Sequence, residues 1–130
     1  MGSETYEAAR KNIKLDGSQL RIILTRNPGR YSANAVPGKL EFSNESPQQL
    51  VKQLENKGFK QMLLLGGGTI NALFLKESLV DELYLTLEPR IFGKGKTLVR
   101  EGEFEVLLEL MNIKRLNQSG TLLLKYKILS

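Results

Sequence analysis

The sequence predicts one α/β domain over residues 1–130, with a mostly parallel mixed sheet flanked by helices and a C-terminal antiparallel hairpin. Segments rich in β-forming residues alternate with helical patterns as far as residue 88, which is typical of a parallel sheet. An apolar run at residues 63–65 leads into three consecutive glycines and then into a helical pattern. Two stretches of alternating apolar residues flank Asn117–Gly120 and predict the hairpin.

Composition excludes several kinds of chemistry. The chain contains no cysteine and no histidine, which excludes disulfides, thiolate nucleophiles, zinc sites built from Cys and His, and imidazole triads; no metal site is expected. The net charge of +5 suits a small phosphorylated ligand, and because the basic residues are scattered we expect no nucleic acid partner. No apolar run approaches the ~20 residues of a membrane span. The N-terminus is polar, so we expect a cytoplasmic protein without a membrane partner.

The first third of the chain predicts a helix and two strands. Residues 3–11 are expected to form a short helix with Ser3 as its N-cap. Residues 20–25 are rich in β-forming side chains and predict a strand, and a short strand is expected at residues 39–42. Residues 27–29 are expected to form a turn that ends the first strand, and the following segment as far as Gly38, rich in small and polar side chains, is expected to form an irregular surface loop.

The second helix has the clearest start. Ser46 is the expected N-cap, Pro47 stands at the first helical position, and Gln49 occupies the capping-box position. Gly58 is expected to end this helix. The run from Phe59 to Leu65 then predicts a buried strand that enters the glycines.

The rest of the chain predicts one helix and three strands. The helix after the glycines should face the core with the side chains spaced i, i+3 and i+4, namely Ile70, Leu73 and Phe74. Residues 81–88 alternate as a strand, and residues 104–110 and 122–128 form the two arms of the hairpin. Glycines at the start of a helix let a ligand approach the backbone, and the free N–H groups there suit a phosphate.

Four segments in order resemble the dihydrofolate reductase-like superfamily. They are residues 1–7 (MGSETYE), 22–28 (IILTRNP), 65–71 (LGGGTIN) and 79–95 (LVDELYLTLEPRIFGKG). The chain is most similar to the reductase domain of the bifunctional riboflavin-biosynthesis deaminase-reductase and its stand-alone relatives. The resemblance covers essentially the whole chain.

This resemblance implies an NADPH-dependent reductase that transfers a hydride to a small heterocyclic or phosphoribosylamino substrate, similar to 5-amino-6-(5-phosphoribosylamino)uracil reductase. It implies that the cofactor pyrophosphate lies on the glycine turn and the following helix start, at Gly66, Gly67, Gly68, Thr69 and Ile70. A second helix start would face the pyrophosphate from the other side, at Gly2, Ser3 and Thr5. Thr25 and Arg26 would contact the adenosine 2′-phosphate, for which a cation beside a hydroxyl is suited. Each of these three groups has an alternative interpretation without a ligand. For the glycine turn it is a tightly packed turn, for the second helix start an ordinary N-cap, and for Thr25 and Arg26 a solvated turn.

The substrate side is less defined, and no catalytic residue is identified. Thr86 comes late in its strand, where α/β sheets tend to bind ligands, and is the expected substrate-side residue. Asp81 and Glu82 are neighbours in a strand, so their side chains should point to opposite faces and serve structure. Lys94 and Lys96 either bind a substrate phosphate or belong to a solvated basic loop.

Two departures from the family pattern change the expectation. Leu65 stands where riboflavin-pathway reductases usually carry glutamate, and Ser3 stands where many relatives have arginine. The first favours a stand-alone relative with another substrate, and the second weakens the expected cofactor phosphate site.

The resemblance also implies an N-terminally shortened domain. The segment at residues 1–7 is normally internal in the family, so the chain is expected to lack a central strand and half of the substrate pocket. The chain is then a fragment, a shortened reading frame, or a protein that closes the gap. We expect a rearranged sheet or intermolecular strand pairing, in a homodimer or a strand-exchanged oligomer.

One alternative function is a catalytically idle nucleotide-binding or assembly domain. Another is a different glycine-rich phosphate-binding protein, although the missing Lys-Ser/Thr pair excludes a P-loop NTPase.

Overall fold

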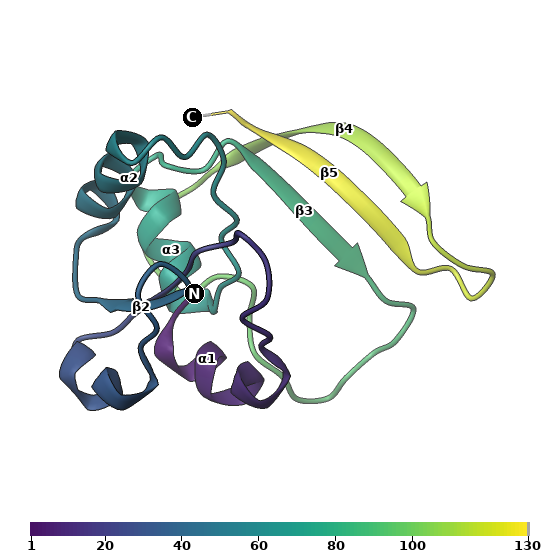
Figure 1. Cartoon of the computed structure of the whole chain (residues 1–130). Coiled ribbons are helices and arrows are strands. Elements are labelled where there is room, and N and C mark those ends of the chain that lie inside the picture. The colour runs from purple at the N-terminus through teal and green to yellow at the C-terminus, as the bar shows by residue number, and fades with distance from the viewer. Residues whose placement is uncertain (130) are drawn as a thin grey trace.

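The computed structural model describes residues 1–129 as a mixed α/β fold, a layered helical part from which an antiparallel sheet projects (Figure 1). Its elements in chain order are α1 (Ser3–Ala9), η1 (Arg10–Asn12), β1 (Arg21–Leu24), η2 (Pro28–Asn34), β2 (Leu40–Ser43), α2 (Pro47–Asn56), α3 (Gly68–Lys76), β3 (Glu82–Leu87), β4 (Leu107–Arg115) and β5 (Leu122–Leu129). The predicted α/β class is confirmed, with a parallel pair β1–β2 and a separate antiparallel sheet in the order β3–β5–β4. None of the helices described is long and apolar enough to cross a membrane.

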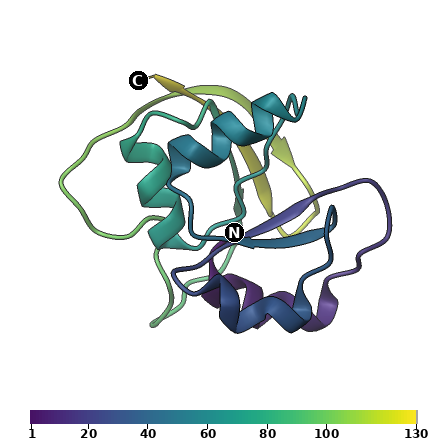
Figure 2. The ribbon, with the colours of Figure 1, turned by 60° about the vertical axis from the view of Figure 1, so that its left-hand side comes forward.

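Strand β1 organises the core because its alternate side chains enter two different hydrophobic clusters. Ile23 is fully buried on the side of α1 and η2, and Leu24 is buried on the side of α2 and α3. Figure 2 shows these helical segments on the two sides of the β1–β2 pair. The first cluster consists of Tyr6, Ile23, Tyr31 and Leu40, and the second of Leu24, Leu50, Leu54 and Phe74.

The start of α2 is as predicted. The Ser46 hydroxyl accepts a hydrogen bond from the Gln49 backbone N–H, and the Gln49 side chain accepts one from the Ser46 backbone N–H. Pro47 occupies the first helical position, where no backbone donor is needed. Two N–H groups of the first turn that would otherwise need water are thereby satisfied.

Three local predictions were wrong. Ser3 is not the N-cap of α1, because Gly2 holds that position and caps without a side chain. Residues 28–34 are not irregular but form η2, because Tyr31 is buried there and stacks on the Phe42 ring at 4.8 Å. Leu73 is 44% exposed, while Ala72 and Phe74 of the same helix are buried.

The largest correction concerns Phe59 to Leu65, which were predicted to form a buried strand. They form no strand (Figure 1), and most of their side chains are exposed. A strand needs a neighbour for its backbone groups, and within residues 1–129 this segment has none on either edge. The parallel sheet is therefore confined to β1 and β2. Within residues 1–129 no other strand joins it, so the rearranged sheet expected from the sequence is not observed there.

The C-terminal hairpin is confirmed as antiparallel, with β5 in the middle of its sheet. The register runs from Glu82↔Lys127 to Leu87↔Leu122 on one edge of β5, and the other edge pairs with β4 through an irregularity between Leu110 and Asn112. Figure 1 shows this sheet extending away from the helices, and all of β4 is exposed. The sheet thus contributes little to either core cluster.

Phe74 and Leu73 give a direct test of the core. We expect Phe74→Ala to lower the free energy of unfolding by about 3–5 kcal/mol because it empties a fully buried ring site. Leu73→Ala on the same helix should cost less than about 1 kcal/mol because that side chain is half exposed. Urea denaturation of the two variants measures the difference, and equal losses would contradict this account of the core.

Candidate functional site

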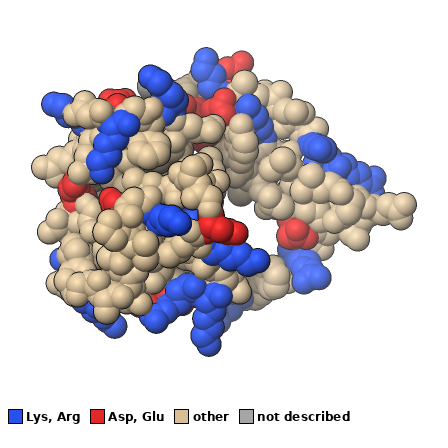
Figure 3. Space-filling model, in the orientation of Figure 1, with Lys and Arg blue, Asp and Glu red and all other residues tan. Residues whose placement is uncertain are grey.

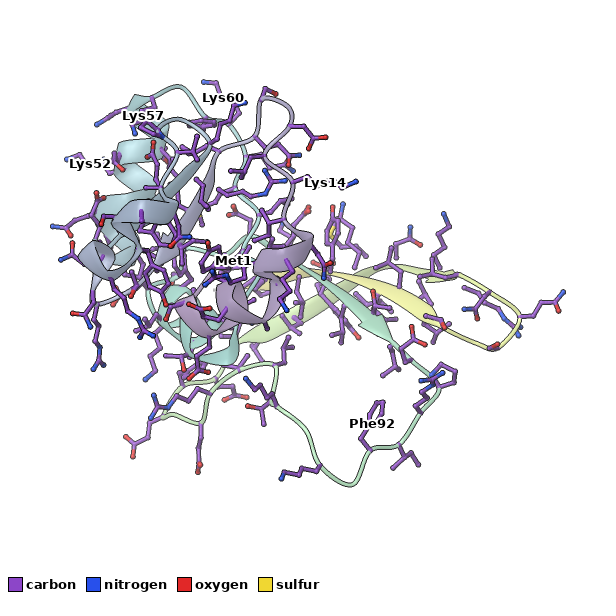
Figure 4. All side chains as sticks on the ribbon, turned by 60° about the horizontal axis from the view of Figure 1, so that its bottom comes forward. Met1, Lys14, Lys52, Lys57, Lys60 and Phe92 are labelled. Atoms are coloured by element: carbon purple, nitrogen blue, oxygen red, sulfur yellow. The ribbon has the colours of Figure 1, made fainter. Side chains whose placement is uncertain are left out.

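The candidate site begins where Gly2 lies between β1 and the glycine turn. The Leu24 N–H donates to the Met1 carbonyl at 2.8 Å, and Gly2 forms an isolated parallel β-bridge with Leu24. On its other side the Gly2 N–H donates to the Gly66 carbonyl at 2.8 Å. Figure 4 shows the labelled Met1 beside the start of α1. These bonds hold the starts of α1 and α3 side by side.

Glycine allows the two helix starts to approach closely. A Cβ at Gly67 would lie 3.2 Å from Thr5 Oγ1, and a Cβ at Gly2 would lie 2.8 Å from Ile70 Cγ1, which is closer than carbon atoms pack. Gly66 has a φ of +80°, a left-handed conformation that favours glycine. The sequence prediction placed these residues in one site, and the structure brings them together.

The first N–H groups of both helices have no protein acceptor within residues 1–129. They belong to Ser3, Glu4, Thr5, Gly68, Thr69 and Ile70. Gly2 and Gly67, the two N-caps, offer no side-chain acceptor. Unpaired N–H groups and the positive ends of two helix dipoles at one place favour an anion.

A loop that sequence reasoning missed covers the start of α3. The Arg100 N–H donates to the Gly68 carbonyl at 3.0 Å, and the Asn71 side-chain amide donates to the Leu98 carbonyl at 2.8 Å. A Cβ at Gly68 would lie 2.9 Å from the Thr97 carbonyl oxygen. Asn71 lies three residues after the last glycine and is the first side-chain amide of α3, and it is the sequence signal that could have indicated this contact.

Thr25 and Arg26 follow the end of β1, one and two residues beyond the pairing of Leu24 with Gly2. The Thr25 hydroxyl accepts a hydrogen bond from the Asn27 N–H at 3.2 Å, which orders the turn. Arg26 is exposed, and the ion pairs of the described chain do not include it. Both residues therefore lie on the edge of the site beside the start of α1.

The predicted substrate-side residues are not gathered in one place. Thr86 is exposed on β3 and pairs in register with Leu123, near the far end of the projecting sheet. Lys96 reaches Glu4 at 3.8 Å, but both side chains are 91% exposed, so this contact adds little stability. Glu82 contacts Tyr84 and Lys125.

A groove of about 1270 Å³ opens beside the glycine turn. Gly66 and Asn71 line it at the turn, the segment 59–65 lines one side, and residues 79–84 line another. Figure 3 shows this face of the molecule hollowed between the helical part and the projecting sheet, with basic side chains spread around rather than collected in one stripe. The groove is the space next to the site in which a second ligand group could lie.

Three side chains with shifted pKa values lie outside the glycine turn. Hydrogen bonding to Tyr31, and then to Arg10, lowers the pKa of the Glu7 carboxyl. Burial, and after it the hydrogen bond to Glu7, raises the pKa of the Tyr31 hydroxyl. A hydrogen bond to Tyr84 raises the pKa of the Lys125 amine. No three His, Cys, Asp or Glu side chains of residues 1–129 gather as metal ligands.

Comparison of the sequence with known families and proteins finds similar sequences. The sequence profile of the family described as RibD C-terminal domain matches residues 13–122. The uncharacterized protein YyaP of Bacillus subtilis is 26% identical over 124 residues, and YwjB of the same organism is 27% identical over 121 residues. The alignments cover 95% and 92% of this chain, but only 63% and 67% of those proteins.

Solved structures share the fold at low sequence identity. A Shewanella sp. PV-4 protein ascribed to riboflavin biosynthesis superposes with a TM-score of 0.80 and 21% identity, covering 100% of this chain and 72% of that one. The diaminohydroxyphosphoribosylaminopyrimidine deaminase/5-amino-6-(5-phosphoribosylamino)uracil reductase of Thermotoga maritima superposes with a TM-score of 0.68 and 18% identity, covering 97% and 43%. Acinetobacter baumannii RibD gives a TM-score of 0.72 with 16% identity, covering 98% and 46%.

The packing of the loop on α3 can be tested at Gly68. We expect Gly68→Ala to lower the free energy of unfolding by about 1–3 kcal/mol, because the added methyl group meets backbone atoms of the loop. Gly93→Ala is the control, because it has open space around it and no left-handed φ, and should leave stability unchanged or raise it by up to about 1 kcal/mol. Thermal or urea unfolding measures both, and a fully stable Gly68→Ala would show that the loop is not seated there.

Proposed function

The chain belongs to the RibD C-terminal domain family, and on that premise we propose that it binds NADPH at the glycine turn as a reductase-type domain. The observation that carries this proposal is the meeting of two helix starts, α1 and α3, at Gly2 and Gly67. Their N–H groups suit the two phosphates of a pyrophosphate, one from each side. The residues present therefore fit the cofactor.

Thr25 and Arg26 are proposed to select NADPH over NADH. The 2′-phosphate carries negative charge that a guanidinium can bind with two parallel hydrogen bonds. Arg26 is exposed, with no ion pair within the described chain to compete for it. Ser3, in the place where many relatives carry arginine, adds a hydroxyl and no charge, so Arg26 is the main source of this selectivity.

When bound, NADPH supplies a hydride for an electrophilic carbon, such as that of an imine. This chain's contribution is to hold the cofactor through the glycine turn and to place the groove beside it, where Gly66 and Asn71 form the shared wall. A small heterocyclic or phosphoribosylamino compound is the proposed substrate class, in line with the name of the Thermotoga maritima protein. Leu65 at the groove wall offers no carboxylate to such a substrate.

A second candidate is a domain that binds the nucleotide without turnover. The groove favours it, because the backbone of residues 60–65 on one side has no hydrogen-bond partner within residues 1–129 and their side chains are largely exposed. Hydride transfer benefits from a site that excludes water. A groove open along one wall serves binding better than catalysis.

Isothermal titration with NADPH and NADH tests the proposed cofactor. We expect tighter binding of NADPH, and we expect Arg26→Ala to reduce the preference for NADPH by about 10- to 100-fold, because a hydrogen bond to a charged group is worth about 1.5–3 kcal/mol. The affinity for NADH should change little in this variant.

Lys114→Ala is the matched control for that titration. It removes the same charge from β4, on the outer strand of the projecting sheet, and should leave both affinities as they are. Failure of the wild-type chain to bind either nucleotide would refute the proposal.

Turnover separates the two candidate functions. The chain is mixed with NADPH and 5-amino-6-(5-phosphoribosylamino)uracil, and the absorbance of NADPH is followed over time. Oxidation of NADPH supports the reductase with that substrate. If NADPH binds to saturation but is not oxidised, the result supports a domain that binds the nucleotide and does not turn over this substrate.

A further inference from the structure

Residues 96–100 contact the starts of both helices that meet at the proposed nucleotide site. Lys96 reaches Glu4, in the first turn of α1, at 3.8 Å. The Arg100 N–H donates to the carbonyl of Gly68, the first residue of α3, at 3.0 Å. In Figure 1 the chain leaves the end of β3 and returns to the helical part beside α1 and α3. This segment, the loop 96–100, therefore forms a wall beside the junction of the two helices.

Asn71 holds this loop from α3. Its side-chain amide donates to the Leu98 carbonyl at 2.8 Å, and its backbone N–H donates to the Gly67 carbonyl at 2.9 Å. The amide also lies beside the glycine turn, because a Cβ at Gly66 would stand 3.5 Å from its Nδ2. One residue thus joins the glycine turn to the loop.

The contact with the loop requires a hydrogen-bond donor at position 71. A backbone carbonyl only accepts hydrogen bonds, so the group that faces Leu98 must carry a hydrogen. The amide of asparagine supplies one, whereas leucine has none and an ionised carboxylate presents only acceptors. A hydrogen bond of this kind changes an equilibrium by about 2- to 12-fold. Asn71 therefore affects how often the loop is seated on α3.

We propose that Asn71 is a positioning residue for nucleotide binding, because it keeps the loop 96–100 seated on α3; this inference rests on the proposed function. Gly68 is half-buried, with the Thr97 carbonyl close to it. The seated loop keeps water from the first N–H groups of α3, and their hydrogen bonds to a pyrophosphate are stronger where water is excluded. A loop that is seated before the nucleotide arrives also leaves less conformational entropy to remove.

Two measurements on Asn71→Leu test this inference. Amide hydrogen exchange, followed by NMR, reports the seating of the loop at the Arg100 N–H, and isothermal titration reports the affinity for NADPH. We expect the variant to lower the protection of that N–H by about 2- to 12-fold. The dissociation constant for NADPH should rise by up to the same factor, because affinity falls with the fraction of chains in the competent state. Leucine has nearly the size of asparagine and a higher helix propensity, so α3 is expected to stay folded.

Gln53→Leu is the matched control, because it exchanges the same amide for the same apolar side chain at an exposed position of α2. It should leave both readouts unchanged. In the wild-type chain, saturating NADPH should raise the protection of the Arg100 N–H, since a ligand that needs the seated loop favours it by the same free energy. A purely structural role for Asn71 would not make this protection depend on the nucleotide.

Asn71→Asp gives a second test, which is reversible within one variant and needs no nucleotide. At about pH 7 the introduced carboxyl is ionised and cannot donate to the Leu98 carbonyl, so the Arg100 N–H should lose protection. Near about pH 4, the ordinary pKa of an aspartyl carboxyl, the group takes up a proton and donates again. Protection relative to the wild-type chain should therefore return as the pH falls.

The outcomes separate this inference from the proposed function. If the wild-type chain binds no NADPH, both are overturned. If NADPH binds equally well to the wild-type chain and to Asn71→Leu, this inference alone is overturned. Weaker binding with full protection of the Arg100 N–H also overturns it, because Asn71 would then act on the nucleotide without the loop. Protection that does not return at low pH in Asn71→Asp would show that the amide does not hold the loop.

Discussion

The hydrogen bonds of Gly2 are the constraint on which the arrangement depends. Gly2 is bridged to Leu24 on one side and donates to Gly66 on the other, so one residue joins β1, the start of α1 and the turn before α3. Only a residue without a side chain can stand there, because Ile70 fills the space that a Cβ would need. The convergence of two helix starts, on which the proposed anion site depends, follows from this junction rather than from either helix alone.

The same junction marks the point beyond which the backbone no longer forms hydrogen bonds within the described chain. Beyond Gly66, toward Lys60, the backbone has no neighbour within the described chain, and the groove opens between that segment and β3. The core is correspondingly divided into two clusters on the two faces of β1, and the β3–β5–β4 sheet contributes almost nothing to them. Leu79 and Val80, just before β3, are the side chains that tie this sheet to the second cluster. A sheet held by so few contacts leaves much apolar surface in solvent.

Local chemistry was predictable from the sequence, and long-range pairing was not. Ser46, Pro47 and Gln49 specify the start of α2 within four residues, so their pattern predicted it correctly. The turn before α3 was predicted because three consecutive glycines between an apolar run and a helical pattern favour a tight turn. The interpretation of 59–65 as a buried strand failed because apolar composition reports a preference for burial but cannot supply the neighbouring strands. Likewise, Tyr31 looked like a loop residue, since its burial depends on Tyr6 and Phe42, which are distant in sequence. The role of the loop at residues 97–100 depends on a contact across 27 positions, between Asn71 and Leu98.

Gly66 joins the proposed nucleotide site to the groove. Its carbonyl accepts a hydrogen bond from the Gly2 N–H, and the same residue lines the groove beside the turn. A turn already held by these contacts leaves a nucleotide less conformational entropy to remove on binding. The groove, in contrast, is largely exposed along residues 60–65, and hydride transfer benefits from a site that excludes water. Nucleotide binding and hydride transfer are therefore expected to depend on different parts of the chain, the first on the junction at Gly2 and the second on this wall of the groove.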